Sequence, residues 1–311
     1  MISQEKIEKI LEIMKKTNES IADLAKALNV KDNTARRYVR LAKEYKRDGT
    51  SLKVPKILLF DVETATMKIE TWGILYKQRP QPYQILEEWF CLSWSAKWLF
   101  DDKIMSDIVT SEEALKRNDS RILKSIWDLL EESDICIGHN SDRFDHRKLN
   151  ARFIKHKMIP PMPYKSIDTL KIAKKHFAFS SYSLEYLCHY LGLTPKLKTD
   201  YSLWRNCLAG DRCALDDMEK YNKRDVLALE ELYIEFLPWI KSHPNLALYM
   251  NLKEPLCSNC GSSNLEWKGF YYTPAGRFKS GRCRNCNAIF RSRYSDLSKE
   301  ERRNLLMGVA K

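Results

Sequence analysis

The sequence predicts an α/β domain between a small all-α unit and a small β unit. Three observations carry this prediction. Residues 53–242 alternate apolar strand-like runs with segments of helical periodicity, an order typical of α/β domains. Residues 1–48 show helical periodicity alone, whereas residues 251–311 hold paired cysteines between short strand-like runs. A chain of 311 residues has room for all three units.

The excess positive charge lies at the two ends of the chain. Residues 1–53 hold 13 Lys+Arg against 8 Asp+Glu, and residues 251–311 hold 12 against 5. Residues 54–250 hold 28 of each sign and are therefore neutral. A localised basic surface indicates a polyanion-binding protein, and nucleic acid is the commonest polyanion. The alternative is a pair of solvated basic faces that serve solubility.

Residues 1–48 are expected to form a helix-turn-helix DNA-binding domain. Helical spacing of apolar residues and capping residues predict helices over residues 7–14, 20–27 and 34–46. The third helix carries a basic stripe opposite its apolar face, formed by Arg36, Arg37, Arg40 and Lys43. Such a stripe suits a helix that enters a DNA groove, and it also suits a plain three-helix bundle with a solvated face.

Two carboxylates follow the first apolar run of the middle domain. The run from Lys56 to Phe60 is typical of a strand that is buried on both faces. Asp61 and Glu63 come directly after it, and side chains at i and i+2 on a strand project from the same side. Two such carboxylates repel each other unless a cation lies between them.

Two further acidic motifs follow in the same domain. The apolar residues 135–137 lead through Asn140 into Phe144-Asp145 at the start of an expected helix. Tyr221 and Asp225 are four residues apart on another expected helix, so they share its otherwise apolar face. A buried carboxylate without a partner costs several kcal/mol, so we expect a partner for Asp225. The remaining elements are expected as strands over 73–77 and 89–98, a strand ending at Asp168 before a helix, and helices over 120–130 and 216–240.

The order D-x-E, N-x-x-x-F-D, Y-x-x-x-D resembles that of the DEDD 3′→5′ exonucleases. This group of the ribonuclease H-like superfamily includes the proofreading domains of polymerases, and the phage and bacterial members share a first motif like F-D-V-E-T. Tyr221 marks the tyrosine subclass, because the sister subclass has histidine where this chain has Lys220. The resemblance implies a ribonuclease H-like mixed sheet flanked by helices.

The resemblance also implies the chemistry of the site. Asp61, Glu63, Asp145 and Asp225 would bind two Mg²⁺ or Mn²⁺ ions, and Tyr221 would orient the attacking water. Hard oxygen ligands suit these ions, and paired ions assist phosphodiester hydrolysis without a covalent intermediate.

Four neighbouring polar residues have open interpretations. Asp142 competes with Asp145 for the second motif, although the aromatic-aspartate pair favours Asp145. Asp168 is either a helix cap or a catalytic group. His139 is more often a structural residue than a ligand, and Asn140 either orients the substrate or closes the turn.

Two C-x-x-C pairs predict a structural zinc site in residues 251–311, which are expected to form a zinc ribbon with a carboxy-terminal helix. Cys257, Cys260, Cys283 and Cys286 offer four thiolates, which leave no open position on a tetrahedral Zn²⁺. Strands are expected over 267–272 and 278–282, and a helix over 298–309 with Ser298 as its cap. The other five cysteines, Cys91, Cys136, Cys188, Cys207 and Cys213, are expected to be small buried hydrophobic residues.

Basic and aromatic residues alternate in the predicted ribbon. The candidate nucleic-acid contacts are Arg282, Arg284, Arg291 and Arg293, beside aromatics such as Trp267, Phe270 and Tyr271. Such a surface can stack on unpaired bases, or the aromatics can form the core of the ribbon and the arginines its solvated rim.

The expected function is 3′→5′ exonuclease activity on nucleic acid, with DNA favoured over RNA and both ends of the chain as tethers. The alternatives are a structure-specific endonuclease on the same fold and a non-catalytic DNA-binding regulator. The start of the chain lacks the pattern of a signal peptide, and apolar runs are short. We therefore expect a cytoplasmic protein of a bacterium or a phage-infected cell, without a membrane partner.

Overall fold

The computed structural model describes residues 10, 12–14, 21–27, 35, 55–73, 80–195, 197, 199–250 and 254–309. The chain divides into two compact units, one of Lys56–Phe236 and one of Met1–Pro55 with Leu237–Lys311. Across the described ranges, no helix has both the length and the hydropathy that a bilayer span requires.

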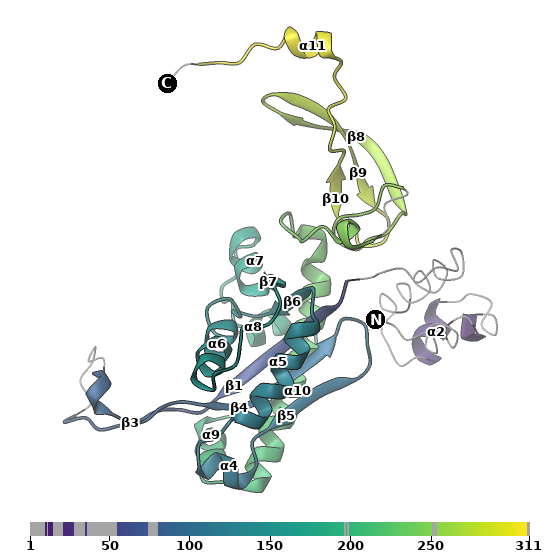
Figure 1. Ribbon diagram of the computed structural model, residues 1–311. Helices are drawn as coiled ribbons and strands as arrows, with labels where there is room; N and C mark the ends of the chain where they lie inside the picture. The colour runs from purple at the N-terminus through teal and green to yellow at the C-terminus, as the bar shows by residue number, and fades with distance from the viewer. Residues whose placement is uncertain are drawn as a thin grey trace. The chain divides into compact units, whose positions relative to one another are not determined.

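A five-stranded mixed sheet forms the centre of the Lys56–Phe236 unit, in the order β5-β4-β1-β6-β7 (Figure 1). The antiparallel neighbours of the sheet are β1 with β4 and β4 with β5, whereas β6 runs parallel to both β1 and β7. The strands are β1 (Ile57–Thr64), β4 (Cys91–Trp98), β5 (Ile104–Ile108), β6 (Ile135–Gly138) and β7 (Lys165–Asp168). The predicted strand before Asp61 is therefore the central strand of the sheet.

Apolar residues bury β1 on both faces. Leu58, Leu59 and Phe60 have no exposed surface, and Leu58 pairs with Trp98 on one side and Cys136 on the other. A strand enclosed in this way is fixed in register, because a slip of one residue would exchange its two faces. The register therefore fixes which side of β1 the carboxylates at its end face.

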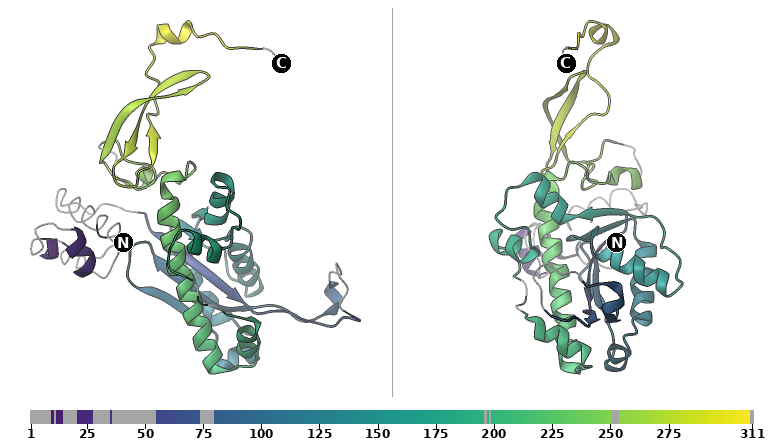
Figure 2. Two further views of the ribbon diagram at one scale, coloured as in Figure 1. Left: turned by 180° about the vertical axis from the view of Figure 1, so that it is seen from behind. Right: turned by 90° about the vertical axis from the view of Figure 1, so that its left-hand side faces the viewer.

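Helices cover both faces of the sheet. In Figure 1 α5 and α6 lie in front of the sheet, and in the view from behind in Figure 2 α10 crosses it. The contacts agree, since α5 contacts β4 and β5, and α10 contacts β4, β1 and β5. The helices of this unit are α4 (Ser111–Leu115), α5 (Ser120–Glu132), α6 (Asp145–Lys155), α7 (Thr169–His176), α8 (Leu184–Tyr190), α9 (Tyr201–Leu208) and α10 (Arg212–Phe236).

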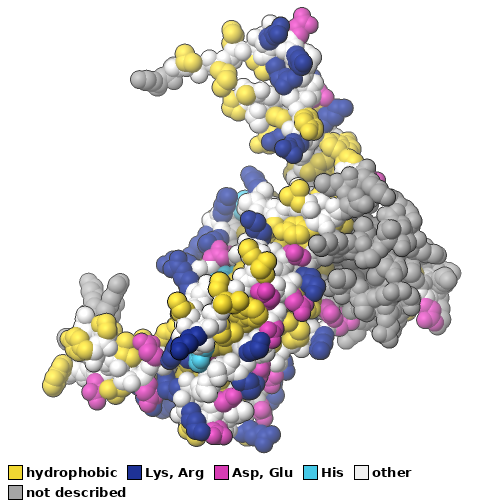
Figure 3. Space-filling view, viewed as in Figure 1, with side chains coloured by type: hydrophobic (Ala, Val, Ile, Leu, Met, Phe, Trp, Pro, Cys, Tyr) yellow, Lys and Arg dark blue, Asp and Glu magenta, His cyan; other side chains and the backbone are white. Residues whose placement is uncertain are grey.

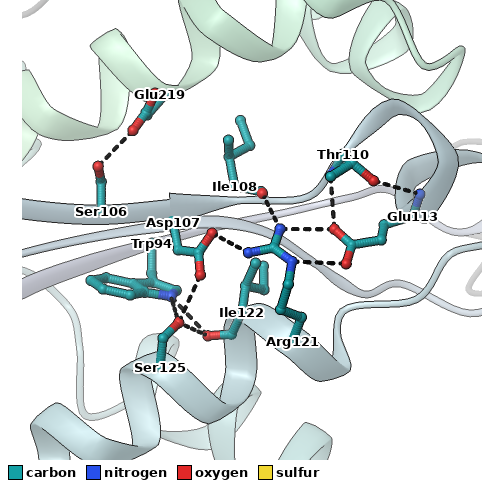
Figure 4. A network of polar contacts seen from close by, with 10 residues as sticks. All are labelled: Trp94, Ser106, Asp107, Ile108, Thr110, Glu113, Arg121, Ile122, Ser125 and Glu219. Atoms are coloured by element: carbon teal, nitrogen blue, oxygen red, sulfur yellow. Dashed lines mark hydrogen bonds and ion pairs between the residues drawn. The ribbon is translucent and has the colours of Figure 1, made fainter.

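A network around Arg121 ties α5 to the edge strand β5 (Figure 4). The Arg121 guanidinium donates to Asp107 Oδ1 at 2.6 Å, to the Ile108 carbonyl at 2.7 Å and to Glu113. Hydrogen bonding to Glu113, and then to Asp107, raises the pKa of Arg121 above its ordinary value. Ser106 donates to Glu219 on α10, so polar contacts hold β5 from both α5 and α10.

A buried ion pair holds α6, the helix that begins at Asp145, against the sheet. Asp119 is fully buried and accepts two hydrogen bonds at 2.7 Å from Arg152 on α6. It also accepts the Cys91 amide of β4 at 2.8 Å and contacts His156. A buried charge is tolerated when it is paired and hydrogen-bonded in this way. These contacts fix the helix that carries the second acidic motif.

Two sequence expectations differ from the observed elements of this unit, and a third falls mostly outside the described residues. The helix expected over 216–240 is α10, which begins at Arg212 and ends at Phe236, because Pro238 disfavours helical geometry at Leu237. A 3-10 turn, η2 (Leu237–Trp239), follows. The strand expected over 89–98 begins at Cys91, and most of the strand expected over 73–77 lies outside the described residues.

The second unit contains a three-stranded antiparallel sheet with the order β10-β9-β8. Besides η2, its described elements are α2 (Ile21–Ala27), η3 (Leu246–Tyr249), β8 (Leu265–Thr273), β9 (Gly276–Cys283), β10 (Ile289–Arg291) and α11 (Lys299–Arg303). The strands β8 and β9 match the two predicted ones. Ser298 caps α11 in a capping box as predicted, but the helix ends at Arg303 and not at 309, because it buries none of its residues.

The predicted helix-turn-helix is described only in part. The helix α2 coincides with the expected second helix and buries Leu24 and Ala25. The four residues of the basic stripe, Arg36, Arg37, Arg40 and Lys43, lie outside the described residues. The DNA-binding domain therefore stays a prediction.

Candidate functional site

Three carboxylates from two distant parts of the chain converge at the end of β1. Carboxylate oxygens of Asp61, Glu63 and Asp225 all lie within 4.8 Å of one another. Asp61 and Glu63 come from β1, and the 2% exposed Asp225 comes from α10, which packs on β1. Like charges at this separation repel strongly in a partly buried site, so the cluster is suited to a cation.

The fourth predicted carboxylate borders the same site. Asp145 is 3% exposed, and its Oδ1 accepts the Val62 amide between the two acids of β1 at 3.1 Å. Burial, and then the charge of Asp61, raises the pKa of Asp145 well above its ordinary value. Asp145 is not part of the three-residue cluster, but it lines the same hollow of about 670 Å³ as Asp61, Glu63 and Asp225.

A tight turn between β6 and α6 directs Asp145 toward the hollow. Gly138 begins the turn, and a Cβ there would lie 2.4 Å from the Cβ of Ser141, so only glycine permits this approach. Asn140 has a φ of 64°, a left-handed conformation that asparagine tolerates. Asp168 accepts the Asn140 amide at 2.9 Å and the Leu170 amide at 2.9 Å, so it caps α7 and ties down the turn. The helix-cap interpretation of Asp168 is confirmed.

The competing candidates have other contacts. Asp142 accepts hydrogen bonds from Lys171 at 2.6 Å and from Ser166, and it does not line the hollow. Partial burial alone would raise the pKa of Asp142. The hydrogen bonds from Lys171 and Ser166 outweigh this effect, so the pKa of Asp142 lies below its ordinary value. His139 lines the hollow, but its ring nitrogens contact the Thr169 hydroxyl and the Tyr182 carbonyl, each at 2.9 Å. These contacts favour Asp145 as the acid of the second motif. They favour a structural role for His139, which joins Thr169 and Tyr182.

Tyr221 lies one helical turn before Asp225 on α10. Its ring is half-buried and edge-on to Trp204 of α9, with centroids 5.9 Å apart. It is not among the residues that line the hollow. The sequence pattern that marks the tyrosine subclass is thus present in the expected helix, while the contact of Tyr221 with water or substrate stays a prediction.

Two further polar residues of the site were missed in the sequence. Asn222 is fully buried on α10, and its Nδ2 donates to Asp61 Oδ2 at 2.6 Å, while Ser93 contacts its Oδ1. Lys174 of α7 is the single lysine or arginine among the described residues that line the hollow. The signal for Asn222 was its place between Met218 and Val226 on the apolar stripe of an amphipathic helix, and Lys174 had none.

We expect Asn222→Ala to weaken Mn²⁺ binding by about 10- to 100-fold, the usual cost of removing a hydrogen-bond partner of a metal ligand. Asn222 holds one carboxylate oxygen of Asp61 in place, so the variant leaves Asp61 free to turn. Calorimetric titration of Mn²⁺ measures the affinity, and the melting temperature in EDTA records any loss of folding. The exposed Asn150→Ala on α6 is the control.

An unchanged Mn²⁺ affinity in Asn222→Ala, with only the melting temperature lowered, would limit this residue to a packing contribution.

Four cysteines form a second cluster, in the Leu237–Lys311 part of the chain. The Sγ atoms of Cys257, Cys260, Cys283 and Cys286 lie within 4.8 Å of one another. The Cys257–Cys286 and Cys260–Cys283 pairs are each 3.6 Å apart, well beyond the disulfide bond length of about 2.05 Å.

The two C-x-x-C turns have the same backbone geometry. The Gly261 amide donates to the Cys257 carbonyl at 2.8 Å, and the Asn287 amide donates to the Cys283 carbonyl at 2.9 Å. Gly261 and Asn287 both have a left-handed backbone conformation, with φ of 69° and 61°. Each C-x-x-C pair is therefore followed by a residue type that accepts this conformation, as tight turns require.

The remaining cysteines follow their prediction with one exception. Cys91, Cys136, Cys188 and Cys207 are buried, and burial raises the pKa of the Cys136 thiol to about 12. Cys213 is exposed in the first turn of α10, so its expected burial is wrong. The helix was expected to begin at residue 216, so its apolar periodicity did not place Cys213 on either side of the helix.

The aromatic residues of the three-stranded sheet are largely exposed. Trp267, Phe270, Tyr271 and Tyr272 all expose 45% or more of their surface. Arg291 lies over the Phe278 ring at 4.2 Å and Arg277 over the Phe270 ring at 4.9 Å. These exposures argue against the interpretation that the four residues form a ribbon core.

The four predicted arginine contacts of this sheet are all exposed, and three of them have partners in or beside the sheet. Arg284 forms an ion pair with Glu266 at 2.8 Å, and Arg282 donates to the Asn287 carbonyl at 3.0 Å. Arg291 donates to the Ser292 carbonyl at 3.0 Å. The structure therefore leaves nucleic-acid binding here as a prediction, with Arg284 already engaged by an acid.

Comparison with known protein families supports the fold of the middle unit. Residues 98–237 match the RNase_H superfamily. A family B DNA polymerase from the hyperthermophilic archaeon Pyrobaculum calidifontis is similar in structure, with 17% sequence identity and a TM-score of 0.43 over 59% of this chain. The match covers a quarter of that polymerase chain (25%). No curated protein matches the chain in sequence.

The predicted fold class is thus confirmed as a mixed α/β sheet of the ribonuclease H-like type, flanked by helices. The four-cysteine cluster is compatible with a zinc ribbon. The superfamily match and the acidic cluster together support a nuclease that acts on nucleic acid.

Proposed function

We propose that the chain is a metal-dependent 3′→5′ exonuclease of the tyrosine DEDD subclass, with DNA favoured as the substrate. The observation that carries this proposal is the convergence of Asp61, Glu63 and Asp225 to within 4.8 Å at the end of β1. The three motifs that resemble this group occur in the expected order, and Asp145 borders the hollow.

The acidic residues fit a pair of divalent cations. Carboxylate oxygens are hard ligands of the kind that Mg²⁺ and Mn²⁺ prefer. Asp61, Glu63 and Asp225 would hold the ions with Asp145 beside them. Burial and then the charge of Asp61 raise the pKa of Asp145, and a cation would offset that charge. Bound ions of this kind lower the pKa of water and stabilise the charge on the departing 3′ oxygen.

The other residues of the hollow would bind and orient the substrate. Lys174 would offer a positive charge to the phosphate, and Asn140 and Ser183 line the same hollow. Tyr221 would position the attacking water after its ring turns from Trp204 toward Asp225, one helical turn away. Positioning of this kind lowers the barrier without a covalent intermediate.

The cysteine cluster fits a structural Zn²⁺. A tetrahedral site with Zn–S bonds of about 2.3 Å has sulfur atoms roughly 3.8 Å apart, close to the observed 3.6 Å. Four thiolates would leave the ion closed to water, so it would stabilise the fold and take no part in hydrolysis. We further propose that this ribbon and the amino-terminal helices tether nucleic acid, in keeping with the net positive charge of both ends of the chain.

End-labelled substrates test the polarity of the proposed reaction. With Mg²⁺ or Mn²⁺, we expect a labelled 3′ nucleotide to be released as a mononucleotide, while a 5′ label stays on a ladder of shortening strands. Matched DNA and RNA strands compare the two substrates.

Two outcomes would contradict this proposal. Discrete internal fragments from branched or RNA-containing duplexes would favour a structure-specific endonuclease. Inactivity on every strand, together with binding to DNA, would favour a non-catalytic regulator.

A further inference from the structure

A two-stranded arm leaves the sheet directly after Thr64. It contains β2 (Lys68–Ile69), η1 (Pro82–Gln84) and β3 (Ile85–Glu87). It projects away from the sheet in Figure 1 and in the left-hand view of Figure 2. An isolated two-stranded hairpin is marginally stable in water, so a lasting arm needs support from its base.

Arg117 supplies that support. Its guanidinium donates to the Thr66 carbonyl at 2.6 Å and to the Glu88 carbonyl at 2.8 Å, and it pairs with Glu87 at 2.9 Å. It also lies over the Phe90 ring at 5.0 Å. One arginine therefore joins both strands of the arm and anchors them to the body of the unit.

Apolar side chains on this supported arm face the solvent. Trp72 is fully exposed and Tyr83 is 86% exposed, and Met67 and Leu86 are also exposed. Figure 3 shows hydrophobic side chains along the arm. Exposed aromatic residues on a supported element indicate a binding surface.

A hollow of about 340 Å³ lies at the base of the arm. It is lined by Ala65, Thr66, Met67, Ile69, Trp89 and Lys148. Lys148 Nζ lies 3.6 Å from the centre of the Trp89 ring, and burial lowers the pKa of Lys148 although the charge of Glu88 acts in the opposite direction. The hollow thus combines an aromatic face, apolar side chains and one cation, the features of a small-ligand pocket of roughly 300–1,000 Å³.

The hollow lies next to the acidic site. Lys148 Nζ is 5.5 Å from the Phe144 ring, and Phe144 lines the acidic hollow beside Asp145. Lys148 also lies one helical turn after Phe144, at the start of α6. Phe144, Lys148 and Trp89 therefore form a row from the acidic hollow to the arm.

We propose that the hollow of Trp89 and Lys148 binds the single-stranded part of the substrate a few nucleotides before its 3′ end. A base would contact Trp89 and the apolar arm residues, and Lys148 would neutralise a phosphate, the combination that binds single strands without sequence preference. This inference rests on the proposed exonuclease function. The substrate strand would then run from the acidic hollow toward the arm.

Length-dependent kinetics test the path. Lys148→Met is expected to raise KM about tenfold on a 12-nucleotide strand and by less on a trinucleotide, which is too short to span both hollows. The matched control is Lys124→Met, which removes a lysine 5.7 Å from the Trp127 ring on α5 and leaves the length dependence unchanged. The same KM change on both strands in Lys148→Met, or none on either, would overturn the inference.

Photo-crosslinking tests the inference with a readout that does not require the enzyme to hydrolyse the strand. Strands with 5-iodouracil at successive positions from the 3′ end are irradiated with the metal-free protein, and crosslinked peptides are identified by mass spectrometry. We expect one window of positions to label the peptide that contains Trp89. Labels confined to the ribbon strands β8 to β10, or a stable self-associated dimer that excludes the strand, would overturn it. Inactivity of the enzyme would refute the proposed function and leave this readout intact.

Discussion

Asp225→Asn is expected to lower the rate of 3′-end hydrolysis by about 1000-fold or more. The amide keeps the shape of the side chain but removes one negative charge from the three-carboxylate cluster. A loss of this size corresponds to about 4 kcal/mol of transition-state stabilisation, within the several kcal/mol that a bound divalent cation supplies. Single-turnover rates with labelled DNA and Mg²⁺ measure the effect.

Asp217→Asn is the matched control for Asp225→Asn, because it lies two turns earlier on α10, is exposed and pairs with Lys220 at 2.8 Å. We expect its rate to remain within about twofold of the parent, as surface ion pairs contribute little. Equal rates for Asp225→Asn and Asp217→Asn would contradict the assignment of the acidic cluster.

Cys283→Ser is expected to release Zn²⁺ and unfold the three-stranded sheet. Cys283 is fully buried in the four-cysteine cluster, and a structural Zn²⁺ contributes about 10–16 kcal/mol of apparent binding free energy in small zinc domains. Metal analysis should give one Zn²⁺ per parent chain and none in the variant. Limited proteolysis should then cut residues 265–291, while the Lys56–Phe236 unit resists cleavage.

The exposed Cys213→Ser is the control, since it changes a thiol outside the cluster. It should keep its Zn²⁺ and the protease resistance of the parent. One Zn²⁺ per chain in Cys283→Ser, or none in the parent protein, would contradict a structural zinc site.

The central strand and the order of the acidic motifs could be predicted because each is a local pattern. The apolar run before Asp61 forces a buried strand, and the i, i+2 spacing puts Asp61 and Glu63 on one side. The buried face of α10 gave the place of Asp225 in the same way. The convergence of Asp61, Glu63 and Asp225 depends on the assembled sheet, which no local pattern shows. It could be expected only from the resemblance to the DEDD 3′→5′ exonucleases.

Other features depend on contacts that no local pattern encodes. Asn222 meets Asp61 across 161 positions of sequence, so its contribution could not be inferred from its neighbours. The edge strand β5 was missed because its residues are all half-buried and show no alternation. The early end of α11 has a different cause, because helical periodicity indicates an apolar face but does not show whether another element covers that face.

Mn²⁺ anomalous diffraction tests the central claim most directly. Crystals with Mn²⁺ and a strand that carries a non-hydrolysable 3′ phosphorothioate should show two peaks about 4 Å apart between Asp61, Glu63 and Asp225, with the 3′ end beside them. A strand bound at this place with no peak among the three carboxylates would contradict the account.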